Sequence, residues 1–158
     1  MKNWKRLTGE KINDLGETVL ADINSYPDSD IKFYCGCDSQ VIKQRILYVT
    51  VIVLYRAGNG GVAYYLREPE AKIHDKARLW NETYKAVTVA MWLNEIIKPV
   101  GLRVNEVHAD LNYDEKHMSS TMVQACLGYI CAMGFEGKIK PYAWCATKVA
   151  NIKTKSMK

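Results

Sequence analysis

The spacing of apolar residues predicts an N-terminal helix followed by three strands. Apolar positions at helical spacing favour a helix over residues 8–25 with Thr8 as its N-cap. Three segments rich in β-branched and aromatic residues follow, at 31–40, 46–55 and 62–67. A glycine-rich turn at 58–61 separates the last two, and Pro69 is expected to close the region. We therefore expect an antiparallel meander, whose first strand ends on the acid Asp38.

Helices and strands alternate in the second half of the chain. The expected elements are a helix over 75–97, a strand over 104–110, a helix over 118–135, a short strand over 138–142 and a last helix from about 147. Pro99 and Gly101 end the long helix, and Pro141 marks the short strand as a sheet edge. Strands separated by a helix run parallel. The pattern predicts an α/β fold with a five-stranded mixed sheet and helices on both faces.

The composition is that of an ordinary soluble globular protein. At 158 residues, with 48% hydrophobic and 25% charged residues, we expect a single domain, its N-terminal helix in 1–27 and its core in 31–158. No apolar run has the length of a membrane span, and residues 1–10 lack the apolar core of a signal peptide. Five cysteines within apolar segments favour reduced thiols in a cytoplasmic protein. They are Cys35, Cys37, Cys126, Cys131 and Cys145.

Positive charge is concentrated at the end of the chain. The formal net charge is +5, and Lys148, Lys153, Lys155 and Lys158 follow one another without an acid between them. A basic end is most often a solvated tail, but it is also what a partner with a phosphate backbone requires.

Three acids occupy positions where a parallel sheet gathers ligands. Asp38 and Asp110 end two strands that become neighbours if the fourth strand lies beside the first, and Glu82 lies near the start of the intervening helix. Carboxylates that are close together repel one another unless a cation compensates. Oxygen ligands suit Mg²⁺ or Mn²⁺, and such an ion activates water and stabilises displacement at phosphorus. The alternatives are a turn-forming role for Asp38 and a solvent-facing Glu82.

Four motifs resemble a known family. They are GCDSQ at 36–40, RLWNET at 78–83, VHADLN at 107–112 and KPYAWCATKVANIKTK at 140–155. Together they resemble the YkuK-like predicted RNase H-like nucleases, over most of the chain from Ile31 onward. The resemblance implies a ribonuclease H-like fold and a divalent-metal-dependent hydrolysis of phosphodiester bonds in RNA, RNA–DNA hybrid or DNA.

The resemblance also implies roles for individual residues. The implied catalytic and metal-binding residues are Asp38, Glu82, Asp110 and Asn151, and the implied substrate-binding residues are Ser39, Gln40, His108, Asn112, Lys148 and Lys155. Asn151 stands where the family pattern has an aspartate, so a second metal ion is expected to bind more weakly. Asp114 or Glu115 could supply the negative charge that Asn151 lacks; the alternative is that both acids simply lie in a loop.

Several of these residues have a second interpretation. His108 fits equally well as a histidine whose hydrogen bonds are satisfied within a sheet. Tyr142 and Trp144 are expected in the core rather than as platforms on which nucleobases stack. The rival interpretation of the whole chain is a noncatalytic module that binds nucleic acid or protein and has kept the fold.

Overall fold

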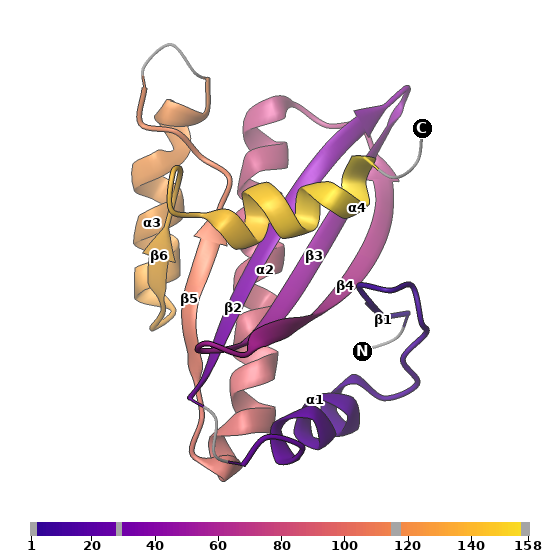
Figure 1. The fold of residues 1–158 in the computed structure, drawn as a ribbon. Coiled ribbons are helices and arrows are strands. Elements are labelled where there is room, and N and C mark those ends of the chain that lie inside the picture. Colours follow the sequence, from indigo (N-terminus) through magenta and orange to yellow (C-terminus); the bar gives the residue numbers. More distant parts are fainter. Residues whose placement is uncertain (1–2, 28–29, 115–117, 156–158) are drawn as a thin grey trace.

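The computed structural model describes residues 3–27, 30–114 and 118–155, which form one mixed sheet flanked by helices (Figure 1). The strands are β1 (Lys5–Arg6), β2 (Ile31–Ile42), β3 (Arg45–Arg56), β4 (Gly60–Ala71), β5 (Val104–Ala109) and β6 (Glu136–Lys138). The helices are α1 (Leu15–Asn24), α2 (Asp75–Ile97), α3 (Val123–Ala132) and α4 (Asn151–Lys155). Two 3-10 segments, Lys98–Val100 and Met118–Met122, and a π-helical segment, Cys145–Ala150, complete the described elements.

The sheet combines an antiparallel meander with parallel strands, as predicted. Its order is β1-β4-β3-β2-β5-β6. The strands β2, β3 and β4 pair antiparallel, whereas β5 pairs parallel with both β2 and β6. The predicted fold class is therefore confirmed, with six strands in place of five. The extra strand, β1, consists of two residues that pair with Tyr64 and Tyr65. A strand of two residues is too short to show an alternation of apolar and polar residues in the sequence.

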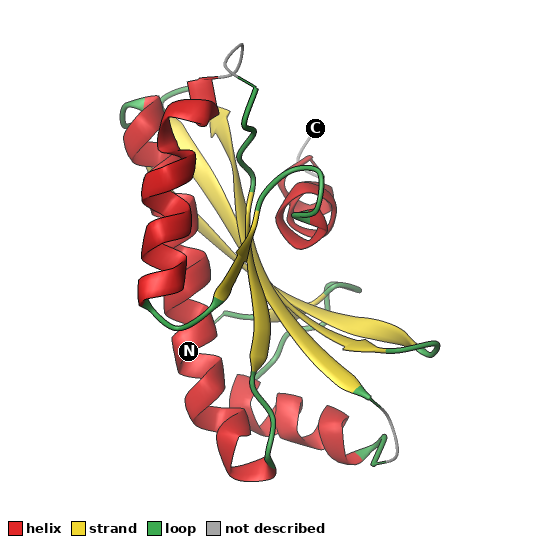
Figure 2. Ribbon diagram, turned by 90° about the vertical axis from the view of Figure 1, so that its left-hand side faces the viewer, coloured by secondary structure: helices red, strands yellow, loops and turns green. Residues whose placement is uncertain are grey.

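Helices cover the two faces of the sheet unequally. The helices α2 and α3 lie on one face, α1 packs at the end of this layer, and the C-terminal segment crosses the opposite face (Figure 2). The main core fills the α2 face, with Phe33 from β2, Val107 from β5 and Leu93 from α2 among its buried members. A smaller cluster, which includes Val51 and Cys145, lies under the C-terminal segment.

Gly36 allows the C-terminal segment to lie directly on β2. A Cβ atom at this position would lie 2.8 Å from the backbone nitrogen of Ala146. Real Cβ atoms do not approach so closely, so a side chain here would push the π-helical segment off the sheet. The glycine between Cys35 and Cys37 therefore allows the backbone of the π-helical segment to pack closely against β2.

The predicted start of the first helix was wrong. The N-cap of α1 is Asp14, whose carboxylate accepts a hydrogen bond of 2.9 Å from the backbone N–H of Glu17. Thr8 lies earlier, in a turn that is closed by a backbone hydrogen bond from Ile12 to Trp4. The backbone groups of this turn are hydrogen-bonded to one another, so residues that the spacing of apolar side chains assigned to the helix are not helical.

Four further boundaries differ from the prediction. Asp38 does not end β2, because β3 pairs with β2 along its full length as far as Ile42. Pro69 lies within β4 opposite Leu47, beyond the part of β4 that β1 covers. The helix expected over 118–135 is divided into a 3-10 turn and α3. The edge strand β6 ends at Lys138, before Pro141.

The burial of cysteine and aromatic residues agrees only in part with expectation. Four cysteines are buried, but Cys131 is exposed on α3. Trp144 packs against Tyr34 and His108, with ring centroids 4.9 and 5.4 Å apart, whereas Tyr142 is 71% exposed and outside the core. None of the described helices is long and apolar enough to cross a membrane.

Candidate metal centre

Asp38 and Asp110 come together where the parallel pairing of β2 with β5 ends. Cys37 of β2 pairs with Ala109 of β5, so the two acids that follow these residues are neighbours on parallel strands. They share a pocket of about 180 Å³ with residues from β2 and from the C-terminal helix. The other lining residues are Ser39, Gln40, Asn151 and Thr154.

Hydrogen bonds hold Asp38 and connect it to α4. Its Oδ1 accepts the backbone N–H of Ser39 at 2.8 Å, and its Oδ2 lies 3.2 Å from the hydroxyl of Thr154. The same hydroxyl is 3.3 Å from Oδ1 of Asn151. Because Asn151 and Thr154 are three residues apart in a helix, both face the sheet. Sequence analysis gave Thr154 no role, although the residue lies within the motif at 140–155.

Glu82 approaches from the other side of β2. Successive side chains of a strand point to opposite faces, so Ser39 faces α2 whereas Asp38 faces α4. The Ser39 hydroxyl donates to Glu82 Oε1 at 2.6 Å, and Arg78 Nη1 donates to the same oxygen at 3.0 Å. Glu82 is only 3% exposed. It is therefore linked to the acid pair through one serine. Arg78, the first residue of the motif at 78–83, contacts Glu82, a role that sequence analysis did not assign.

Burial disfavours the charged forms of these acids. Burial, together with the charge of Asp110, raises the pKa of Asp38 to about 6, although hydrogen bonds from Ser39 and Thr154 oppose the shift. Burial raises the pKa of Glu82 to about 8, and the charges of Asp38 and Asp110 add to this shift. The charge of Asp110 thus acts on both Asp38 and Glu82, and the charge of Asp38 acts on Glu82. A positive charge between the acids would relieve this repulsion.

Lys140 already supplies one positive charge. Its Nζ lies 2.6 Å from Oδ1 of Asp110, and both side chains are partly exposed. Lys140 and Arg78 thus neutralise the negative charges of two of the three predicted ligands, Asp110 and Glu82. Within the described ranges, no three His, Cys, Asp or Glu side chains gather as a metal-binding group. The structure brings together two of the three predicted acids, Asp38 and Asp110, and connects Glu82 to Asp38 through Ser39.

The donor atoms of the pocket nevertheless fit a hard cation. Asp38 and Asp110 provide carboxylate oxygens, Asn151 an amide oxygen and Thr154 a hydroxyl. Mg²⁺ and Mn²⁺ prefer such all-oxygen ligands. A divalent ion at Asp110 would compete with the ammonium of Lys140, since both positive charges would lie at the same carboxylate.

Comparison with known proteins agrees with the topology. A family model described as "Ribonuclease H-like" matches residues 14–155. The chain belongs to the ribonuclease H-like family. It is also 28% identical over 157 residues to "Uncharacterized protein YkuK" of Bacillus subtilis (strain 168), an alignment that covers 90% of each chain. The resemblance noted from the motifs is thereby confirmed, and family membership supports a nuclease-like fold.

His108 of this ribonuclease H-like chain is fully buried, and both of its ring nitrogens have partners. Nδ1 accepts the backbone N–H of Cys145 at 3.0 Å, and Nε2 lies 2.8 Å from Glu106 Oε2. Burial lowers the pKa of His108, although the hydrogen bond to Glu106 opposes this. These contacts favour the interpretation of a satisfied histidine over a direct substrate contact. His108 instead anchors the start of the segment that carries Asn151.

The remaining predicted substrate residues differ in their distance from the pocket. Gln40 lines it, and Ser39 is bound to Glu82. Asn112 accepts a hydrogen bond from the backbone N–H of Asp114 and so shapes the loop after β5. Lys148 is exposed on the π-helical segment and does not line the pocket. The side chain of Lys155 and all of Glu115 lie outside the described part of the structure.

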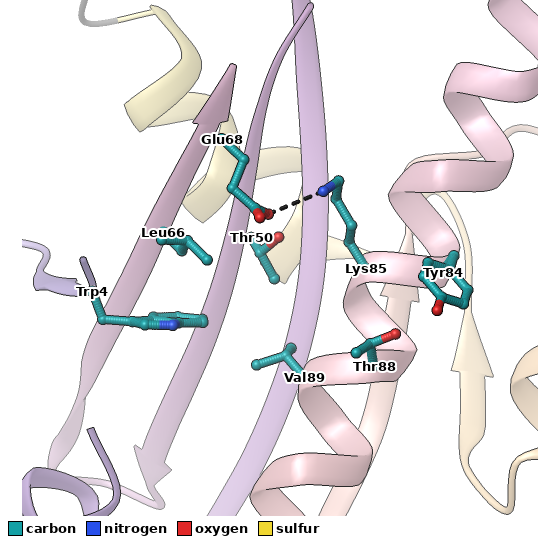
Figure 3. A pocket seen from close by; sticks show the side chains of 8 residues that line it. All are labelled: Trp4, Thr50, Leu66, Glu68, Tyr84, Lys85, Thr88 and Val89. Atoms are coloured by element: carbon teal, nitrogen blue, oxygen red, sulfur yellow. Dashed lines mark hydrogen bonds and ion pairs between the residues drawn. The ribbon is translucent and has the colours of Figure 1, made fainter. Parts of the chain in front are cut away.

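A larger pocket lies on the opposite face of the sheet. It has a volume of about 340 Å³ and is formed by α2, β3, β4 and Trp4 (Figure 3). Lys85 within it is already paired with Glu68 at 3.1 Å and with Glu70 at 2.6 Å. The pocket contains none of the residues that the motifs single out, so we base no function on it.

Proposed function

We propose that the protein is a Mg²⁺- or Mn²⁺-dependent nuclease that hydrolyses phosphodiester bonds of RNA, RNA–DNA hybrid or DNA. The observation that carries the proposal is that Asp38 and Asp110, which directly follow the paired residues Cys37 and Ala109, line one pocket together with Asn151. A ribonuclease H-like fold supports the same chemistry. The proposal includes the cytoplasmic location predicted from the sequence, with which free cysteines agree.

Each residue of the site has a role in this proposal. Asp38 and Asp110 would hold a divalent ion, which would lower the pKa of water and neutralise charge at phosphorus. The Ser39 N–H and the Thr154 hydroxyl fix the orientation of the Asp38 carboxylate. Lys140, once released from Asp110, becomes available to pair with a phosphate of the substrate.

Glu82 and Asn151 tune the site in opposite directions. Glu82 provides a third carboxylate, which Arg78 and Ser39 hold beside β2. Asn151 provides an oxygen without the charge of an aspartate, so a second ion binds weakly. We therefore expect activity of the natural sequence to be weak.

A noncatalytic binding module is the second candidate function. It is favoured by the ion pair between Lys140 and Asp110, which neutralises a predicted ligand without a metal, and by the missing charge at Asn151. In this case the basic C-terminal segment would bind nucleic acid, and the acid pair would be a remnant.

Cleavage assays separate the two functions. Labelled single-stranded, duplex and hybrid substrates are incubated with wild type, Asp38→Asn and Asn151→Asp across a Mg²⁺ and Mn²⁺ series. We expect weak or absent cleavage by wild type, none by Asp38→Asn, and a rise in Asn151→Asp that is largest at low Mg²⁺. If neither wild type nor Asn151→Asp cleaves and neither binds metal, the nuclease proposal fails and the binding module stands.

A further inference from the structure

Three of the four most exposed large hydrophobic side chains of the described chain belong to segments that build the candidate metal centre. Four large hydrophobic residues are more than half exposed: Tyr142 (71%), Tyr113 (64%), Ile152 (56%) and Tyr84 (52%). The first three belong to segments that build the centre, because they lie close in sequence to Lys140, Asp110 and Asn151 respectively. Tyr84 alone lies on the other face of the sheet, on α2 (Figure 3).

The two loops that carry Tyr113 and Tyr142 are joined to each other. The backbone N–H of Lys140 donates to the carbonyl of Leu111 at 3.0 Å, and Leu111 is buried. The ion pair between Lys140 and Asp110 links the same two loops through their side chains. Both tyrosines are therefore exposed on anchored loops that meet at a predicted metal ligand.

The ring of Tyr142 is exposed although residues close to it in sequence are packed in the protein. Trp144, two residues after Tyr142, is packed against Tyr34 and His108. Buried Ile139 and Ala143 flank Tyr142, whose backbone N–H closes a turn onto Ile139 at 2.8 Å. The chain thus buries the neighbours of Tyr142 and leaves its ring outside, where a flat apolar ligand can reach it.

We propose that the centre takes an unpaired nucleic-acid strand whose bases stack on Tyr113 and Tyr142. The inference rests on the proposed function for the role of the acid pocket, and it specifies the class of substrate. Every nucleobase has a flat face that stacks on an aromatic ring, whereas in a duplex these faces are occupied by neighbouring base pairs. Lys140 and the exposed Lys148 supply positive charge for the phosphates of such a strand.

Binding to labelled oligonucleotides tests the inference separately from cleavage. The probes are roughly 12-nucleotide single strands of DNA and RNA, and the same sequences as duplex and hybrid, measured by fluorescence anisotropy with Ca²⁺ as the cation. Wild type should bind the single strands at least about tenfold more tightly than the duplexes. Tyr113→Ala and Tyr142→Ala should each weaken single-strand binding by roughly five- to hundredfold and leave duplex binding unchanged.

Matched variants distinguish stacking from other effects. Tyr113→Phe and Tyr142→Phe keep the flat ring and should bind as wild type does. Tyr84→Ala removes an exposed tyrosine from the opposite face and should also have no effect. Equal affinity for single strands and duplexes, unchanged single-strand affinity in both alanine variants, or no binding of any probe would overturn the inference.

The cleavage assay keeps the two proposals apart. Cleavage of hybrid or duplex without tyrosine-dependent binding of single strands overturns the inference and leaves the nuclease function standing. Tyrosine-dependent binding of single strands supports the inference even if neither wild type nor Asn151→Asp cleaves in Mg²⁺ or Mn²⁺ and neither binds metal, the result that overturns the nuclease function.

Discussion

The two faces of the sheet are built for different purposes. On the α2 face, a continuous apolar core joins α1, α2, α3 and the strands. On the opposite face, one short C-terminal segment covers a small apolar cluster and brings Asn151 and Thr154 to the acid pair. The stability of the domain therefore depends mainly on the α2 face, whereas the other face carries the polar groups of the candidate centre.

Three contacts of the C-terminal segment with the sheet lie close to the candidate centre. His108 accepts the N–H of Cys145, Gly36 leaves room for Ala146, and the Thr154 hydroxyl reaches Asp38. Each of these contacts sets the position of Asn151 relative to Asp38. A change on this face should therefore alter the centre more than it alters global stability.

The largest effect is expected from the core of the α2 face. Leu93 is fully buried on α2, so Leu93→Ala should lower the free energy of unfolding by about 3 kcal/mol, through lost burial and a residual cavity. Met91 on the same helix is 43% exposed, and Met91→Ala should change the free energy of unfolding by less than about 0.5 kcal/mol. Urea denaturation measures both, and equal effects would contradict the assignment of the main core to this face.

A smaller effect on stability is expected at the contact between β2 and the C-terminal segment. Gly36→Ala should destabilise the protein by roughly 1–3 kcal/mol, because the new Cβ meets the backbone of Ala146. It should also reduce metal-induced thermal stabilisation, since the segment carries Asn151. Gly128→Ala is the control, because a Cβ there meets no neighbour and alanine favours the helix. A Gly36→Ala protein with wild-type stability and metal response would refute the proposed close packing.

The contrast between the faces also explains what the sequence could predict. The bounds of α2 were predicted as observed, because a long periodic stripe ends at Pro99 and Gly101. The neighbouring positions of Asp38 and Asp110 were predicted on the condition that the fourth strand lies beside the first, and β5 indeed pairs with β2. These predictions rest on patterns within one element or on the order of elements.

Contacts between distant side chains were beyond the reach of sequence patterns. Arg78, Lys140 and Thr154 belong to the centre only because three separate elements meet there. The direction of approach of Glu82 depends on which face of β2 the Ser39 side chain occupies. The exposure of Tyr142 depends on a turn, whereas residue type favoured its burial.

The pH dependence of the metal-free protein tests how Glu82 is buried. A raised pKa means that the folded state keeps its proton at pH values where the unfolded state has lost it, so stability falls as pH rises from about 4.5 to about 8. Asp38, with a pKa of about 6, contributes only to the lower part of this decline. In Glu82→Gln, the decline between about pH 6 and pH 8 should disappear. Thermal melts in a chelator across this range measure it, and an unchanged decline in the variant would assign the effect to another group.

The smallest effect is expected from a single exposed lysine. If Lys148 contacts a phosphate, Lys148→Ala should reduce the slope of log affinity against log salt by nearly one unit and leave stability unchanged. Oligonucleotide binding at several salt concentrations measures the slope. Salt-independent binding, or the wild-type slope in the variant, would exclude this contact.

Calorimetric titration of Mn²⁺ tests most directly whether the acid pair is a metal site. If an ion and the Lys140 ammonium compete for Asp110, Lys140→Gln should bind Mn²⁺ more tightly than wild type, and Asp110→Asn should not bind it measurably. Lys138→Gln is the control, because Lys138 pairs with Glu136 away from the pocket, and its Mn²⁺ affinity should match that of wild type. Equal Mn²⁺ affinity in wild type and Asp110→Asn, or no binding even by Lys140→Gln, would contradict the account.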